Sequence, residues 1–79
     1  MAVASRTIPL KQFRLQLRPE LSQESMAHRA GVVLQTYRKA EKGYDVLLST
    51  AVAIWKALNS ERKLRGNSPV TFEQVFDVS

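Results

Sequence analysis

Apolar residues in this sequence recur three or four positions apart, and that spacing places them on one face of an α-helix. No segment alternates apolar and polar residues for long enough to predict a β-strand. The three glycines and three prolines divide the chain into segments of helical length. The pattern therefore predicts an all-α fold, a compact bundle of about five helices within one domain of 79 residues.

A proline separates the first two predicted helices. The first helix covers residues 7–17 and ends before Pro19, because proline disfavours helical geometry at the preceding residue. Residues 1–6 are expected to form an N-terminal arm. The second helix begins after Ser22, a good N-cap, and ends at Gly31, since glycine readily adopts the left-handed conformation that ends a helix. The apolar stripe of the first helix consists of Leu10, Phe13 and Leu17.

A third, short helix follows this glycine closely. It is predicted over residues 34–42 and ends at Gly43, while Val33 stands at its N-cap position without a side chain that could accept a hydrogen bond. Ala27 lies where the second and third helices cross, so a larger side chain there would push them apart. Two short helices joined by a turn that contains glycine form a helix-turn-helix, here over residues 22–42.

Two more helices are predicted in the C-terminal part of the chain. One lies within residues 46–65 and ends at Gly66. The other covers residues 71–77 and begins at Thr71, which forms a capping box with Gln74. The apolar face of this last helix consists of Phe72, Val75 and Phe76.

Residues 22–43 read SQESMAHRAGVVLQTYRKAEKG, and this segment resembles the helix-turn-helix of Cro/CI-type phage repressors and bacterial Xre-family regulators. The resemblance extends, less strongly, over residues 10–76. It implies a phage-repressor-like bundle of about five helices that binds double-stranded DNA in transcription regulation, commonly as a dimer. The matching residues are Ser22, Gln23, Glu24, Ala27, Gly31, Val32, Glu41, Lys42 and Gly43.

Four features of the sequence depart from the family pattern. The family often has an arginine at the place of Gln16, paired with a glutamate, so Gln16 is expected to hydrogen-bond Glu41 instead. Val33 replaces the usual Ser or Thr cap, and Tyr37 replaces an aliphatic residue. The link between the last two helices, residues 59–70, is longer than usual.

The outer face of a recognition helix presents polar side chains to base edges in the major groove. In the third helix, Gln35 suits adenine, and Arg38 or Lys39 suits guanine. Val33 and Leu34 suit thymine methyl groups, with packing against the body of the domain as the alternative for Leu34. The resemblance assigns base contacts to Val33, Leu34, Gln35 and Lys39, and not to Arg38. The predicted phosphate contacts are Gln23, Thr36, Lys42 and Tyr44.

The composition favours a polyanionic partner. Twelve Lys and Arg residues against seven Asp and Glu give a net charge of +5 and an isoelectric point near 10.1, which suits DNA. The lack of cysteine excludes disulfides and thiolate metal sites. No nucleotide-binding loop, metal cluster or nucleophile–base pair is visible in the sequence, so we predict that the protein is not an enzyme and needs no cofactor or metal.

The sequence also carries an expectation about location. Its first ten residues, MAVASRTIPL, lack the apolar run of a signal peptide. No stretch approaches the roughly 18 apolar residues that a membrane helix requires. We therefore expect a cytoplasmic, nucleoid-associated protein with no membrane contact.

Two questions about partners stay open on the sequence alone. The alternative to a regulator is an antitoxin-like or other protein-interaction module that binds a partner protein through its C-terminal segment, residues 59–79. The chain either forms a homodimer through that segment or is a monomer that pairs only on DNA.

Overall fold

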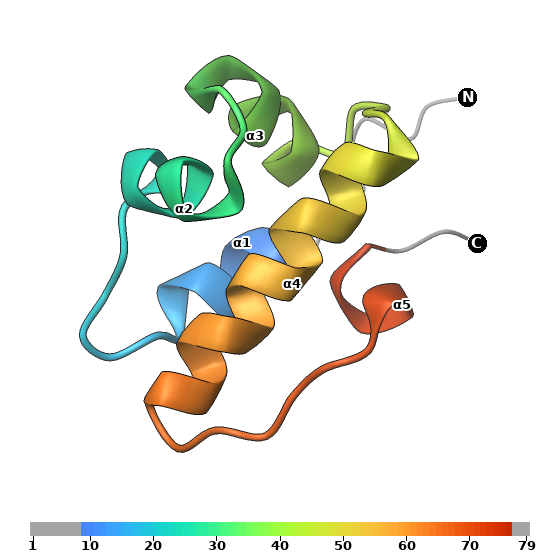
Figure 1. The fold of residues 1–79 in the computed structure, drawn as a ribbon. Helices are drawn as coiled ribbons and strands as arrows, with labels where there is room; N and C mark the ends of the chain where they lie inside the picture. The colour runs from blue at the N-terminus through green and yellow to red at the C-terminus, as the bar shows by residue number, and fades with distance from the viewer. Residues whose placement is uncertain (1–8, 77–79) are drawn as a thin grey trace.

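The computed structural model describes residues 9–76, and within them the chain forms five α-helices and no β-strand (Figure 1). This confirms the predicted all-α bundle. None of the helices in this range is both long and apolar enough to cross a membrane. The helices are α1 (Pro9–Leu15), α2 (Gln23–Ala30), α3 (Leu34–Glu41), α4 (Leu48–Leu64) and α5 (Phe72–Val75).

A single apolar core holds the helices together. α2 packs against both α3 and α4, α1 contacts α3 and α5, and α5 also contacts α4. α4 is the longest element and runs away from α3, so that α3 and the C-terminal end of α4 lie at opposite ends of the molecule (Figure 1). The large side chains that are fully buried come from every helix and from the segment after α1: Leu10, Leu17, Met26, Tyr37, Ile54, Leu58 and Val75.

The turn between α2 and α3 forms as the sequence predicts. The Ser22 hydroxyl accepts a hydrogen bond from the backbone N–H of Ser25 at 3.1 Å, which caps the start of α2. Gly31 ends α2 with φ at +74°, a left-handed conformation that costs glycine nothing. Ala27 is buried on α2, the helix that packs on α3, so a small side chain occupies this contact. Val33 provides no side-chain cap for α3, as expected.

The predicted ends of two helices need correction. α1 ends at Leu15 rather than residue 17, although Leu17 stays fully buried just beyond the helix. α5 ends at Val75, because Phe76 already has extended backbone angles, whereas the prediction ran to residue 77. The capping box of α5 forms as predicted. The proposed arm, residues 1–6, and the predicted start of the first helix lie outside the described residues.

The long link predicted over residues 59–70 is shorter in the structure. α4 covers Leu48–Leu64, within the range 46–65 predicted for it, so Asn59 belongs to the helix and not to the link. The side-chain amide of Asn59 donates to the carbonyl of Val70 and accepts from its N–H, both at 2.9 Å. The indole N–H of Trp55 donates to the same carbonyl at 2.8 Å. These three bonds fasten the chain before α5 to the side of α4.

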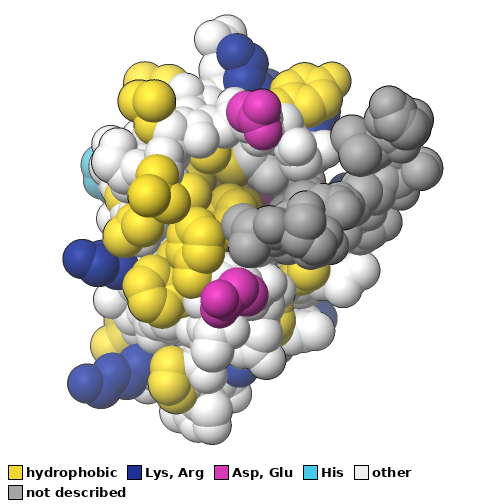
Figure 2. All heavy atoms as spheres, turned by 90° about the vertical axis from the view of Figure 1, so that its right-hand side faces the viewer, with side chains coloured by type: hydrophobic (Ala, Val, Ile, Leu, Met, Phe, Trp, Pro, Cys, Tyr) yellow, Lys and Arg dark blue, Asp and Glu magenta, His cyan; other side chains and the backbone are white. Residues whose placement is uncertain are grey.

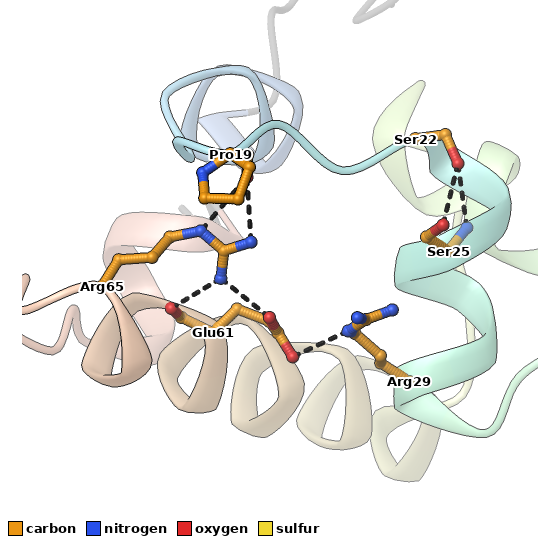
Figure 3. Close-up of polar contacts among 6 residues, drawn as sticks. All are labelled: Pro19, Ser22, Ser25, Arg29, Glu61 and Arg65. Carbon is orange, nitrogen blue, oxygen red and sulfur yellow. Dashed lines mark hydrogen bonds and ion pairs between the residues drawn. The ribbon is translucent and has the colours of Figure 1, made fainter.

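An ion-pair network fastens the other side of α4 (Figure 3). Glu61 accepts from Nε of Arg29 on α2 and from Nη1 of Arg65, each at 2.8 Å. Arg65 also donates through Nε and Nη2 to the carbonyl of Pro19, at 3.2 and 2.9 Å. Burial alone would raise the pKa of Glu61, but the hydrogen bond from Arg65 and the charge of Arg29 hold that pKa below its usual value. The network therefore joins α4 to α2 and to the α1–α2 segment.

Candidate nucleic-acid interface

α3 is amphipathic, and its polar face is turned to solvent. Tyr37, Ala40 and Glu41 are buried against the body of the domain, on the side of α3 away from the predicted outer face. The side chains on the outer face are exposed, and three of them carry the hydrogen-bonding or positively charged groups expected of base contacts: Gln35, Arg38 and Lys39.

The two apolar residues at the start of α3 lie in different environments. Val33 is 66% exposed directly before the helix. Leu34 is half-buried and packs against the core, so the structure shows the packing alternative for this side chain. Of the two, Val33 is therefore the side chain that is free to reach a thymine methyl group.

The four predicted phosphate contacts also differ in exposure. Lys42 and Tyr44 are exposed after the end of α3, with Tyr44 62% accessible, and Thr36 is half-buried on the helix. Gln23, the first residue of α2, is half-buried, and its amide Nε2 donates to Oε1 of Glu41 at 2.8 Å. The side chain of Gln23 thus already serves to join α2 to α3.

The expected bond from Gln16 to Glu41 is wrong, because Arg14 occupies that place. Nε of Arg14 lies 2.6 Å from Oε2 of Glu41, and Nη2 lies 3.2 Å from Oε1. Nη1 donates to the carbonyl of Leu21 at 3.1 Å. The helical spacing contained the signal, since Arg14 follows the buried Leu10 by four residues and shares its face, whereas Gln16 is exposed just beyond the end of α1.

The electrostatics of this cluster keep both partners charged. Burial alone would raise the pKa of Glu41, but hydrogen bonds from Arg14 and Gln23 outweigh it and leave that pKa lowered. The hydrogen bond to Glu41 in turn raises the pKa of Arg14. Burial raises the pKa of Tyr37, and its hydroxyl has no hydrogen-bond partner among the described residues. A charged pair consequently locks the end of α3 onto α1.

An open hollow of about 480 Å³ lies between α3 and the start of α4, which the sequence analysis did not foresee. Thr36 and Lys39 line it from α3, and Asp45 and Thr50 line it from the other side. Its apolar lining consists of Val46 and Leu47, the latter 75% exposed. The hollow therefore opens beside α3, with one lysine, Lys39, and one carboxylate, Asp45, among its lining residues.

Comparison of the chain with protein-family models, curated proteins and solved structures gives no match. The functional interpretation of the surface therefore depends on its own geometry and charge. The geometry is that of a short helix, held by the Arg14–Glu41 ion pair, with an exposed polar face. The charge comes from the cationic end of this helix, formed by Arg38, Lys39 and Lys42.

Proposed function

We propose that this protein binds double-stranded DNA sequence-specifically, with α3 in the major groove, and acts as a transcriptional regulator. The observation that best supports this proposal is that α3 is anchored on its inner side while its outer side is exposed to solvent. The ion pair between Arg14 and Glu41 anchors the inner side of α3, while Gln35, Arg38 and Lys39 extend from its outer side. A major groove about 12 Å wide admits one α-helix in this way.

The side chains on and beside α3 have distinct roles in the proposed complex. The amide of Gln35 makes a bidentate contact with adenine, and Arg38 or Lys39 reaches O6 and N7 of guanine. Val33 contacts a thymine methyl group. Lys42, Tyr44 and Thr36 bind phosphate oxygens and set the register of the helix in the groove. Regulation would follow from occupancy, because a bound domain excludes or recruits the polymerase.

A single helix of this length reads only a few base pairs, which is too little to select one site in a genome. A pair of copies on two half-sites about one helical turn apart supplies the missing information. Within one chain, Val75 is fully buried, while Phe72 and Phe76 are half-buried and stack with ring centroids 5.1 Å apart. Because α5 already packs on its own domain, we propose a monomer that pairs on DNA.

Selection of bound sites from a random DNA pool tests the proposal. We expect an enriched motif with two-fold symmetry and half-sites about 10 base pairs apart. Binding to that motif should weaken with salt, with a slope of log K against log salt near −4 to −5 per subunit if about five phosphates are neutralised. An unenriched pool, or binding that does not change between about 50 and 200 mM salt, would overturn the proposal.

A further inference from the structure

A second surface lies at the opposite end of the molecule from α3. An open groove of about 630 Å³ runs between the outer side of α4 and the chain that leads to α5. We call it the α4 groove, and its lining residues are Trp55, Lys56, Ser60, Lys63, Asn67 and Pro69, together with Asn59. Its volume falls within the range of sites that bind ligands or short peptide segments.

The floor of the α4 groove is apolar and rigidly held. The polar ends of Trp55 and Asn59 are bonded to the backbone of Val70, so the indole offers the groove its ring and not its N–H. Phe72 packs edge-on against that ring, with centroids 5.9 Å apart and an interplanar angle of 87°. A preformed aromatic surface of this kind binds an apolar side chain with little loss of conformational freedom.

The rim of the α4 groove is cationic. Lys56 and Lys63 are both exposed and stand seven residues apart on α4, which is about 10 Å along the helix axis. The buried residues Ile54 and Leu58 lie on the other side of α4, so both amines extend toward solvent beside the groove. No acidic side chain lines the groove. An extended chain of three or four residues spans about the same length as the rise between these two positions of α4.

The groove adjoins an apolar part of the surface. Figure 2 shows hydrophobic side chains gathered over the face that carries α4 and α5, with Lys and Arg side chains along one edge and Asp or Glu side chains beside them. Figure 1 places α3 far from the C-terminal half of α4. A partner in the groove would therefore leave the polar face of α3 free.

We propose that the α4 groove binds an acidic segment of another protein. One apolar side chain of that segment packs on the ring of Trp55, and flanking carboxylates pair with Lys56 and Lys63. Lys56 and Lys63 are the charged residues among those that line the groove, whereas Glu73 lines the adjoining hollow on the α5 side of Trp55. Two lysines beside an apolar floor favour an acidic segment over an uncharged or basic one. The protein would then hold DNA at one end and a partner protein at the other.

Trp55 gives a direct readout, because it is the only tryptophan of the chain. The probe is a peptide of about ten residues with a central Leu-Phe pair between runs of Glu and Asp, and it contains no tryptophan. We expect saturable change in Trp55 emission and amide chemical-shift changes confined to residues 55–72. Lys56→Glu and Lys63→Glu should each weaken binding by about tenfold, because a like charge then faces the peptide. Ser60→Trp, read by chemical shifts, should block the groove.

Two matched controls separate the groove from general attraction between opposite charges. Lys11→Glu changes an exposed lysine on α1 and should alter affinity by less than about twofold. Lys42→Glu, at the end of α3, tests whether the acidic peptide imitates DNA. Equal losses in Lys42→Glu and Lys63→Glu, no saturable signal, or equal binding of a peptide with Gln and Asn in place of its acids would each overturn the proposal. If Lys56→Glu or Lys63→Glu lowered the affinity for DNA as much as Lys42→Glu does, the two lysines beside the groove would instead be assigned to DNA binding.

Discussion

Nε of Arg14 lies 2.6 Å from Oε2 of Glu41, and this contact joins the first helix of the domain to the last residue of the helix that we propose reads DNA. Both side chains are nearly enclosed, with 9% of Arg14 and 2% of Glu41 exposed. A buried charge without its partner is strongly unfavourable, so each side chain depends on the other. The pair therefore joins α3 to α1, in addition to the packing of Tyr37 and Ala40 in the core.

Removing one partner of this pair should destabilise the fold severely. We expect Arg14→Met or Glu41→Leu to lower the free energy of unfolding by about 3–5 kcal/mol, because each leaves one charge buried and unpaired. The double variant should be more stable than the sum of the two losses predicts. Denaturant unfolding of all four proteins measures this coupling, and additive losses would contradict it.

Stability should fall in acid because of two carboxylates. The pKa of Glu41 and that of Glu61 are both lowered in the folded protein, so both groups stabilise the fold when they are ionised. That stabilisation is present above their ordinary value of 4.5 and is lost as the pH falls through their folded pKa values. Melting temperatures between about pH 6 and pH 2 should show the drop. Glu41→Gln should make the pH dependence shallower, and an unchanged slope would exclude Glu41 as a source.

Gly31 should be replaceable only by residues that tolerate a left-handed backbone. Its φ is +74°, and a Cβ placed there would meet no heavy atom within 4 Å, so the cost of a side chain is conformational rather than steric. We expect Gly31→Ala to destabilise by about 1–2 kcal/mol and Gly31→Asn by less. Gly31→Val should be the worst of the three, since β-branched residues fit this region poorly. A lower melting temperature for Gly31→Asn than for Gly31→Ala would contradict this account.

Substitutions around α3 should divide into two kinds of DNA-binding defect. Gln35→Ala and Lys39→Ala should each reduce discrimination between the selected site and a scrambled duplex by about 1–3 kcal/mol. Lys42→Ala should weaken both duplexes equally and reduce the salt slope by about one. Competition binding at several salt concentrations measures both effects. If Lys42→Ala relaxed specificity while Gln35→Ala did not, the assignment of residues along α3 would be wrong.

The free protein should sediment as a monomer at micromolar concentration and pair on a symmetric site. Val75 is buried within its own domain, so the central apolar residue of α5 is not available to a second copy. Phe76→Asp alters a half-buried ring that stacks on Phe72 and should leave the monomer unchanged in size. A wild-type dimer that Phe76→Asp dissociates would show that the C-terminal segment forms a stable interface before DNA is met.

Most of the fold could be predicted from the sequence, because local signals carry it. Caps and stops are short-range features, and Ser22, Gly31 and the Thr71 capping box behave as their side-chain chemistry requires. The inner face of α3 followed from helical periodicity alone. Helix lengths were less predictable, because neither α1 nor α5 ends directly at a glycine or proline.

The partners of side chains across the fold were harder to predict. The choice of Gln16 over Arg14 came from matching a family position and not from the face that Leu10 marks on α1. The sequence gives no indication that Gln23 donates to Glu41, since the two are 18 residues apart. The bonds from Asn59 to Val70 were equally hidden, because they depend on how the chain folds back along α4.

Val70 lies outside every helix, yet both of its backbone polar groups are bonded to Asn59 and its side chain is 8% exposed. Amide hydrogens in surface segments usually exchange rapidly with solvent, whereas this one can exchange only after the segment detaches from α4. Hydrogen exchange should therefore find slow exchange at Val70 between faster neighbours. By that measure, Val70 belongs to the same cooperative unfolding unit as α4, and the segment before α5 opens only when that unit loosens.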